Sequence, residues 1–259
     1  MPSAAAVRLQ IEQDLESRFP SALTPAPRTI REVATTGIDA ADDLLDGGLP
    51  VGAISEIVGP ASSGRTTLTL SFVARRTSEG RVCAWVDVSD ALDPESAAAN
   101  GVNLRQLLWV RCRDSVQTSA GKSRPWTRLD QALRATDLLL QAGGFAAIVL
   151  DLADTSPEHA NRIPLATWFR YRQAADRTRC SLLVLGKAAY AQSSAALAVE
   201  CVPLRPETAG STVLRGFTYE LFRGRQRFAP GSVANRTGAR KQPASTWSAG
   251  TCWDAEKRA

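Results

Sequence analysis

The chain has 259 residues, of which 44% are hydrophobic, and a formal net charge of +5. This length is sufficient for one large domain that buries its own core. It contains no run of 18 apolar residues, and its N-terminal stretch turns acidic where a signal peptide would need an apolar centre, so we expect a soluble protein that is neither membrane-spanning nor exported.

The first predicted element is a short amphipathic helix. Between residues 4 and 19, apolar side chains recur every four residues, and prolines at 20, 25 and 27 then break the pattern. Residues 1–29 are therefore predicted to form a helix and a linker. The apolar stripe has two interpretations: packing on the helix's own domain, or docking on a neighbouring subunit or partner.

From residue 30 onward, apolar strands alternate with amphipathic helices. Strands are predicted at 53–59, 82–88, 107–112, 146–152 and 181–187, and helices at 66–80, 128–144 and 164–178. Residues 113–127 have the composition of an exposed loop. Segments 195–204 and 212–224 are predicted to form an antiparallel edge. The pattern predicts an α/β core over residues 30–228, with a mainly parallel twisted sheet and helices on both faces.

The C-terminal segment holds the basic bias of the chain. From Arg223 onward, eight Lys or Arg face two acidic residues, a balance of +6, whereas the preceding 222 residues sum to −1. Residues 229–259 are predicted to be a flexible tail. Its tryptophans at 247 and 253, like Trp126 in the loop, would then be exposed interface anchors. The candidate DNA-binding residues are Arg223, Arg225, Arg227, Arg236, Arg240 and Lys241. The alternative is a solvated strand edge and tail.

The five cysteines are widely spaced, without a C-x-x-C pair. We expect reduced, mostly buried thiols in a cytoplasmic protein, with neither a zinc site nor a disulfide framework. The one histidine, His159, lies in a predicted loop and is expected to be an ordinary surface residue.

Residues 59–67, GPASSGRTT, have the spacing of a phosphate-binding loop, G-x-x-x-x-G-K-[ST], with arginine in place of lysine. The loop follows a predicted strand and opens a predicted helix, so its backbone N–H groups can surround a phosphate. The candidate nucleotide-binding residues here are Gly59, Ser62, Ser63, Gly64, Arg65, Thr66 and Thr67. A metal site is predicted from the Thr66 hydroxyl and from Asp151 at the end of an apolar strand; the alternative for Asp151 is a strand-end carboxylate without metal.

Two stretches carry a resemblance to a known family. Residues 47–70, GGLPVGAISEIVGPASSGRTTLTL, and residues 82–112, VCAWVDVSDALDPESAAANGVNLRQLLWVRC, resemble the RecA recombinase family. The resemblance implies the RecA ATPase core with ATP and Mg²⁺ as cofactors. It also implies that Asp93, in the ALDP turn, and Lys187, at the sensor position, border the nucleotide.

Four residues depart from the family pattern around this one pocket. Besides Arg65, the chain has Ser89 where the family has its water-activating glutamate, Ser96 where an aromatic stacks on adenine, and Lys187 where a glutamine senses the γ-phosphate. The neighbouring Asp90 would point to the opposite face of a strand. Because loss of a general base costs about 10²- to 10⁴-fold in rate, we expect ATP to be bound weakly or not at all and hydrolysis to be weak or lost, with no catalytic residue at Ser89.

The segments after Asp151 and Lys187 are also shorter than the DNA-binding loops of the family, so strand exchange is not expected. Together these features resemble the ImuA branch of RecA-like proteins. That resemblance implies an accessory role in SOS mutagenesis and translesion synthesis, with an ImuB-type Y-family polymerase homologue and an error-prone DnaE-type polymerase as partners. Single-stranded DNA and self-association through the N-terminal helix are further expected interactions. The alternatives are a DNA-dependent ATPase of recombinase type and, more remotely, a division inhibitor of the SulA type.

Overall fold

The computed structural model describes residues 29–113, 127–209, 213–230 and 244–250. The predicted N-terminal helix, most of the loop at 113–127 and part of the tail therefore lie outside the described residues. No helix in the described part is long and apolar enough to cross a membrane.

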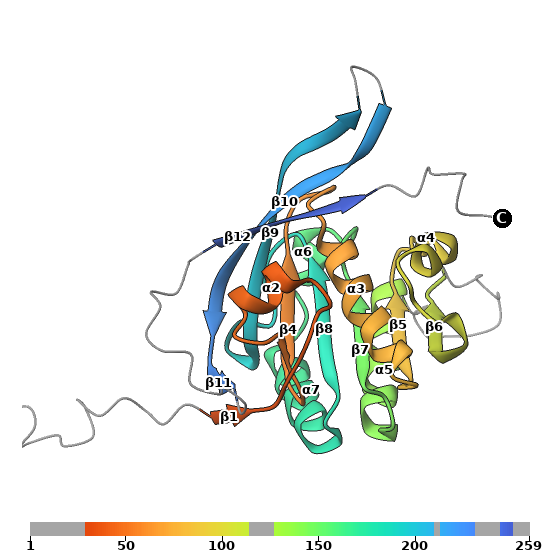
Figure 1. The fold of residues 1–259 in the computed structure, drawn as a ribbon. Helices are drawn as coiled ribbons and strands as arrows, with labels where there is room; N and C mark the ends of the chain where they lie inside the picture. Colours follow the sequence, from red (N-terminus) through yellow and green to blue (C-terminus); the bar gives the residue numbers. More distant parts are fainter. Residues whose placement is uncertain (1–28, 114–126, 210–212, 231–243, 251–259) are drawn as a thin grey trace, which may run out of the picture.

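An eight-stranded sheet forms the centre of the molecule (Figure 1), and its strand order is β12-β10-β9-β4-β8-β7-β5-β6. The strands from β9 to β6 run parallel, while β9, β10 and β12 are antiparallel neighbours. The strands are β4 (Ile54–Val58), β5 (Cys83–Asp87), β6 (Leu107–Arg111), β7 (Ala147–Asp151), β8 (Ser181–Gly186), β9 (Ala195–Ala209), β10 (Val213–Gln226) and β12 (Ala244–Gly250). This confirms the predicted α/β architecture.

Short elements complete the sheet region. Strands β1 (Thr29–Arg31) and β11 (Phe228–Pro230) form one parallel pair, and β2 (Val33–Ala34) and β3 (Leu49–Pro50) form an antiparallel pair. The helices are α2 (Asp39–Leu44), α3 (Arg65–Ser78), α4 (Pro94–Ala99), α5 (Arg128–Ala142), α6 (Pro157–Ala160) and α7 (Leu165–Thr178). The three long predicted helices are therefore present.

Helices cover both faces of the sheet because the central strands are apolar on both sides. Along β5, Cys83 and Trp85 face the core beneath α2, α3 and α4, whereas Ala84 and Val86 face the core beneath α5 and α7. Successive side chains on a strand point to opposite faces, so one fully apolar strand supplies both cores. All four described cysteines are buried and free, as predicted.

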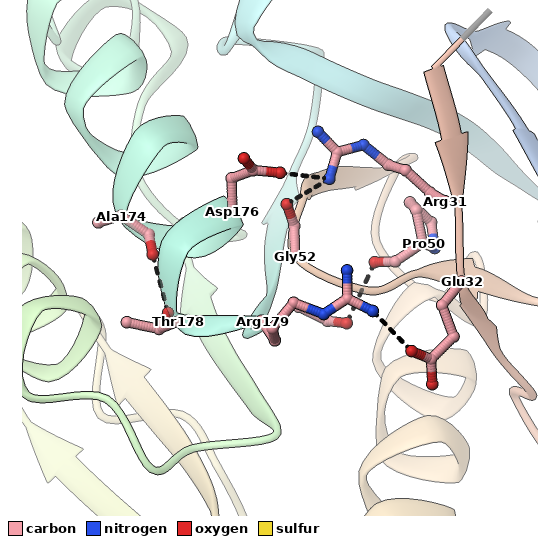
Figure 2. Close-up of polar contacts among 9 residues, drawn as sticks. Arg31, Glu32, Pro50, Gly52, Ala174, Asp176, Thr178 and Arg179 are labelled. Carbon is pink, nitrogen blue, oxygen red and sulfur yellow. Dashed lines mark hydrogen bonds and ion pairs between the residues drawn. The ribbon is translucent and has the colours of Figure 1, made fainter.

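Polar contacts join Arg31 and Glu32, at the end of β1, to the C-terminal end of α7 (Figure 2). The Arg31 guanidinium donates to the Asp176 carboxylate and to the Gly52 carbonyl, each at 2.8 Å. Arg179, just beyond α7, pairs with Glu32 at 2.6 Å. These bonds lie at the edge of the sheet where β4 and β8 begin, opposite the edge that carries the phosphate loop.

The predicted antiparallel edge is confirmed for β9 and β10, but it is not the end of the sheet. β12 pairs with β10 over seven residues, with Trp247 opposite Tyr219. Trp247 is only 7% exposed and belongs to the core. The predicted flexible tail is therefore wrong for residues 244–250, and Trp247 is not an exposed anchor, because its indole packs on β10. Trp126 and Trp253 lie outside the described residues.

Candidate functional site

The phosphate loop connects β4 to α3 at the carboxyl edge of the sheet. Three of its residues have positive φ: Gly59 at 156°, Ser62 at 58° and Gly64 at 83°. Helix α3 begins at Arg65, directly after the left-handed Gly64, and carries no acidic residue in its first turn. Consecutive N–H groups and the positive end of a helix dipole therefore face the same region, which is an arrangement that binds anions.

Two of the loop glycines are required by close packing. A Cβ on Gly59 would lie 2.3 Å from the Cys201 carbonyl oxygen of β9, and one on Gly64 would lie 2.8–2.9 Å from the ring carbons of Tyr219 on β10. The loop thus rests against β9 and β10 as well as on its own helix. The same packing holds Ser63, whose Oγ is buried and has no hydrogen-bond partner.

The Arg65 side chain is folded back onto the loop and is only 7% exposed. One guanidinium nitrogen donates to the Gly59 carbonyl and, at 3.3 Å, to the Gly186 carbonyl at the end of β8. Gly186 also accepts the Gly59 N–H at 3.2 Å. Arg65 therefore links the phosphate loop to the last residue of β8 through one guanidinium nitrogen.

Asp151 lies where it was predicted, at the end of β7 in the carboxyl edge of the sheet. Burial raises its pKa to about 6; the neighbouring Asp87 also raises it, while the Ala153 N–H and the Arg65 charge lower it. The Asp151 carboxyl therefore keeps its proton to a higher pH than an ordinary aspartate, and a nearby cation would lower its pKa. The Thr66 hydroxyl, at the start of α3, belongs to an exposed residue.

Asp87 is a site residue that the sequence analysis missed. It is Asp151's direct neighbour in the register of β5 and β7. Its carboxylate accepts the N–H groups of Ala91 at 3.1 Å and Leu92 at 2.9 Å, and the Trp109 indole N–H at 3.2 Å. Three donors on one buried carboxylate make it a fastening point for the turn that follows β5. Its strand-end position, shared with Asp151, was the signal that could have identified it.

The turn after β5 places Ser89 and Asp90 differently from the prediction. Strand β5 ends at Asp87, so neither residue is on a strand, and Asp90 adopts a left-handed conformation with φ of 59°. The argument from opposite strand faces is therefore wrong. The Asp90 carboxylate nevertheless accepts two hydrogen bonds from Arg111, one from Nε and one from Nη2 at 2.7 Å, and this pair holds the pKa of Asp90 below its usual range.

Asp93 and Ser96 form the N-terminus of α4. The Asp93 carboxylate accepts the backbone N–H groups of Glu95 at 3.2 Å and Ser96 at 3.0 Å, and also the Ser96 hydroxyl at 2.5 Å. These donors hold the pKa of Asp93 below its ordinary value. Both side chains are thus used to cap the helix.

Lys187 follows Gly186 and is exposed at the carboxyl edge of the sheet. The segment behind it is fastened by Glu56, a fully buried residue of β4 whose carboxylate accepts the N–H groups of Tyr190 at 2.5 Å and Ala191 at 2.7 Å. Burial raises the pKa of Glu56. β9 then begins at Ala195, which confirms that only a short segment follows Lys187.

A cluster of aromatic rings lies beside the loop, and sequence reasoning did not foresee it. The ring of Tyr219 lies 4.8 Å from that of Trp247 and 6.1 Å from that of Phe217, and its hydroxyl is hydrogen-bonded to Thr67 of α3. Tyr219 and Trp247 are both buried. The alternation of Phe217, Tyr219 and Leu221 along β10 was the available signal.

The described arginines of the candidate DNA-binding set contact the protein itself. Arg223 donates to the Leu44 carbonyl at 3.0 Å and to the Asp46 carboxylate at 3.1 Å. Arg225 and Arg227 donate to carbonyls of the segment after Lys187, at Gln192 and Ser193 respectively. Each therefore has a structural role, and DNA binding by them stays a prediction. Arg236, Arg240 and Lys241 lie outside the described residues.

Two further sequence predictions concern His159 and the metal site. His159 is an exposed residue of α6 whose ring bonds the Ser156 hydroxyl at 2.7 Å. Within the described residues, no group of three or more His, Cys, Asp or Glu side chains could hold a metal ion. A metal at Thr66 and Asp151 would thus depend on oxygens from a bound ligand and from water.

Comparison with known proteins shows similarity to RecA proteins. The RecA protein of Rickettsia canadensis is 37% identical over 148 residues, which are 57% of this chain and 39% of that protein. The RecA protein of Cereibacter sphaeroides is 45% identical over 121 residues, 46% of this chain and 31% of that protein. The chain thus matches less than half the length of these relatives.

Among solved structures, the RadB recombinase superposes with a TM-score of 0.51 at 20% identity, over 75% of this chain and 90% of that one, which shows a shared fold. The RecA N-terminal domain family matches residues 24–160, more than half of the chain, and includes the phosphate loop, Asp87 and Asp151. The protein therefore belongs to the RecA family.

Proposed function

We propose that this protein is a RecA-family accessory factor of DNA repair that keeps a nucleotide site for binding and has largely lost hydrolysis. The observation that carries the proposal is that the carboxylates at the end of β5 and in the following turn already accept hydrogen bonds within the chain. Ser89 stands at the water-activating position, Asp90 is paired with Arg111, and Asp87 is occupied by three N–H donors. A general base must be able to accept a proton from water, and neither aspartate is placed to do so.

Arg65 supports the same conclusion. A lysine at this position acts as a compact point charge, whereas a guanidinium is a planar fork that cannot be exchanged for it without change in geometry. In this protein one nitrogen of the fork donates to the carbonyls of both Gly59 and Gly186. Redirecting that nitrogen toward a terminal phosphate would cost those two hydrogen bonds, which weakens its stabilisation of a transition state.

The residues present nevertheless fit ATP and Mg²⁺. The loop from Gly59 to Thr67 has the backbone of a phosphate site and a buried, unpartnered Ser63 hydroxyl. Thr66 and Asp151 would hold the metal, which supplies charge neutralisation at the phosphates. Asp151, with a pKa of about 6, is mostly ionised at pH 7, and a bound cation would lower that pKa further.

The pathway and partners are proposed from the resemblance to the ImuA branch. In this proposal the protein works in damage-tolerant synthesis with an ImuB-type Y-family polymerase homologue and an error-prone DnaE-type polymerase, and single-stranded DNA is a further partner. Support comes from the degenerate turn after β5 and from the short segment between Gly186 and Ala195. The SOS response and a cytoplasmic location belong to the same proposal.

The test compares ATP turnover by the full chain with and without single-stranded DNA. The wild type and Arg65→Ala are expected to show equally low turnover. The double substitution Arg65→Lys with Ser89→Glu is expected to raise it by at least tenfold, because it restores a point charge and a base. DNA-stimulated turnover by the wild type that Arg65→Ala abolishes would instead establish the second candidate, a DNA-dependent ATPase, which the preserved loop geometry favours.

The partner proposal needs a separate experiment. Co-purification of the full chain from its own cells after DNA damage is expected to recover polymerase subunits. Recovery of a division protein in place of polymerases would contradict the repair assignment.

A further inference from the structure

The solvent side of α7 carries an apolar surface. Leu165 is 56% exposed and Phe169 is 53% exposed, and no other large apolar side chain in the described part of the chain is as exposed. Residues four apart on a helix are neighbours, so these two side chains form one surface. The buried side chains of the same helix, Trp168 and Tyr171, belong to the core beneath it. A single exposed leucine is ordinary, but a leucine beside a phenylalanine on the solvent side of a helix indicates a docking surface.

This surface continues to the place where the described chain begins. Arg172 and Asp176 follow Leu165 and Phe169 at helical spacing, and we call these four exposed residues the α7 stripe. The Asp176 carboxylate accepts a hydrogen bond from the Arg31 guanidinium at 2.8 Å (Figure 2). Arg31 is the last residue of β1, the first described element. The residues before β1 therefore join the described chain at one end of the α7 stripe.

The N-terminal segment 4–19 has an apolar row that needs a partner. Val7, Ile11, Leu15 and Phe19 recur every four residues, as they would on one side of a helix. A helix of this length is marginally stable in water by itself, so its stability has to come from packing of the apolar side. The pair of exposed apolar side chains on α7 offers such a packing surface.

The charges of the two elements are complementary. Between residues 4 and 19, three acidic residues and two arginines give a net charge of −1, whereas α7 has three arginines and one aspartate, a net charge of +2. The acidic residues Glu12, Asp14 and Glu16 are interspersed with the apolar row. Arg172, in the middle of the α7 stripe, has no ion-pair partner among the described residues. Opposite charges beside an apolar contact favour one partner over others.

The length of the connection favours docking within one chain. Residues 20–28 link the segment to β1, and nine extended residues span up to about 30 Å. Along α7, Phe169 lies about 10 Å and Leu165 about 16 Å from Asp176, so the linker reaches both. A short flexible linker gives its segment an effective concentration in the millimolar range, roughly a thousandfold above that of a second copy at about 1 µM.

We propose that residues 4–19 fold back as a helix onto the α7 stripe of their own chain. Their apolar row covers Leu165 and Phe169, and their acidic residues lie beside Arg172. The two apolar surfaces are then buried against each other, so neither is offered for self-association. This inference goes beyond the proposed function and does not depend on nucleotide or DNA binding.

Hydrogen exchange measured by mass spectrometry on the full chain tests the proposal. Residues 4–19 are expected to exchange at least about tenfold more slowly than the same residues in a free peptide 1–19, equally at about 1 µM and about 20 µM protein. Phe169→Ser is expected to bring them within about twofold of the peptide. Leu138→Ser is the matched control, because Leu138 is a 52% exposed leucine of α5 outside the α7 stripe, and it should leave the protection unchanged.

A reciprocal variant identifies the contact. Leu15→Ser is expected to remove the protection as Phe169→Ser does, and the double variant should show no further loss, because each substitution breaks the same contact. Absence of protection in the wild type overturns the proposal, as does an equal loss in Leu138→Ser. Protection that appears only at the higher concentration, together with a dimer in sedimentation, also overturns it, since a second copy would then supply the segment. Each of these results leaves the expected ATP turnover untouched.

Discussion

Removal of the Trp247 side chain tests whether β12 is part of the folded core. Trp247 faces Tyr219 in the register of β12 and β10, with ring centroids 4.8 Å apart, and is 7% exposed. Truncating a buried tryptophan to alanine costs about 3–5 kcal/mol. The buried indole N–H has no partner, and its removal offsets about 1–3 kcal/mol of that cost. We expect Trp247→Ala to lower the free energy of unfolding by about 2–3 kcal/mol.

Urea denaturation followed by far-ultraviolet circular dichroism measures this difference. With an m value of about 3 kcal/mol/M, the midpoint is expected to fall by about 1 M. Trp253→Ala is the matched control, because residue 253 lies in the segment predicted from sequence to be a flexible tail. Its effect is expected to stay within about 0.5 kcal/mol. Equal midpoints for the two variants would refute the reasoning and return residues 244–250 to the tail.

Three further predictions concern the site. Asp151 has a pKa of about 6 against an ordinary 3.8, so the folded chain binds this proton more tightly than the unfolded chain and stability falls as pH rises through that range. Between pH 4 and pH 8, the free energy of unfolding of Asp151→Asn should therefore rise relative to that of the wild type by up to about 3 kcal/mol. Parallel pH profiles of the two free energies would contradict this. Glu56→Ala should speed hydrogen exchange of the two backbone N–H groups that donate to the Glu56 carboxylate. Glu56→Gln keeps an acceptor oxygen and should keep much of the protection. Equal exchange rates in the two variants would show that this carboxylate does not hold the segment. Gly64→Ala should lower the free energy of unfolding by about 2–4 kcal/mol, because residue 64 has a left-handed φ of 83° and the added Cβ would press on an aromatic ring. Gly80→Ala, with a φ of 72° and open space around the added Cβ, should lower it by only about 1–2 kcal/mol. Thermal unfolding compares them, and equal losses would argue against the ring contact.

Much of the core could be predicted from the chain because its elements are locally encoded. The phosphate loop is recognisable from spacing alone, and its strand and helix follow from period-2 and period-3.6 patterns. Asp151 was identified as a strand-end carboxylate, and the short segment after Lys187 was read directly from the sequence. These features depend on neighbours within a few residues, so no knowledge of the fold was needed.

The errors have a different physical origin. β12 was taken for tail because its composition is small and polar, and only pairing with β10 gives Trp247 a buried position. Asp90 was treated as a strand residue although the predicted strand ends at residue 88, and in the structure Asp87 holds the backbone of the following residues in a turn by accepting their N–H groups. The engagement of Arg223 with Asp46 joins residues 177 positions apart, which no local pattern reports.

The sequence by itself determined the class of fold and the presence of a phosphate loop with arginine at its lysine position, since each is a matter of residue type at a fixed local spacing; that Ser89 replaces a glutamate is what the resemblance to the RecA family implies. The tertiary structure decided what those residues do. Arg65 meets the carbonyl of Gly186 from a distance of 121 residues along the chain, and Glu56 meets the amides of Tyr190 and Ala191 from 134 and 135. Such contacts exist only after parallel strands from distant segments have brought their carboxyl ends to one edge of the sheet, because chain folding, and not sequence spacing, sets which charges and donors become neighbours.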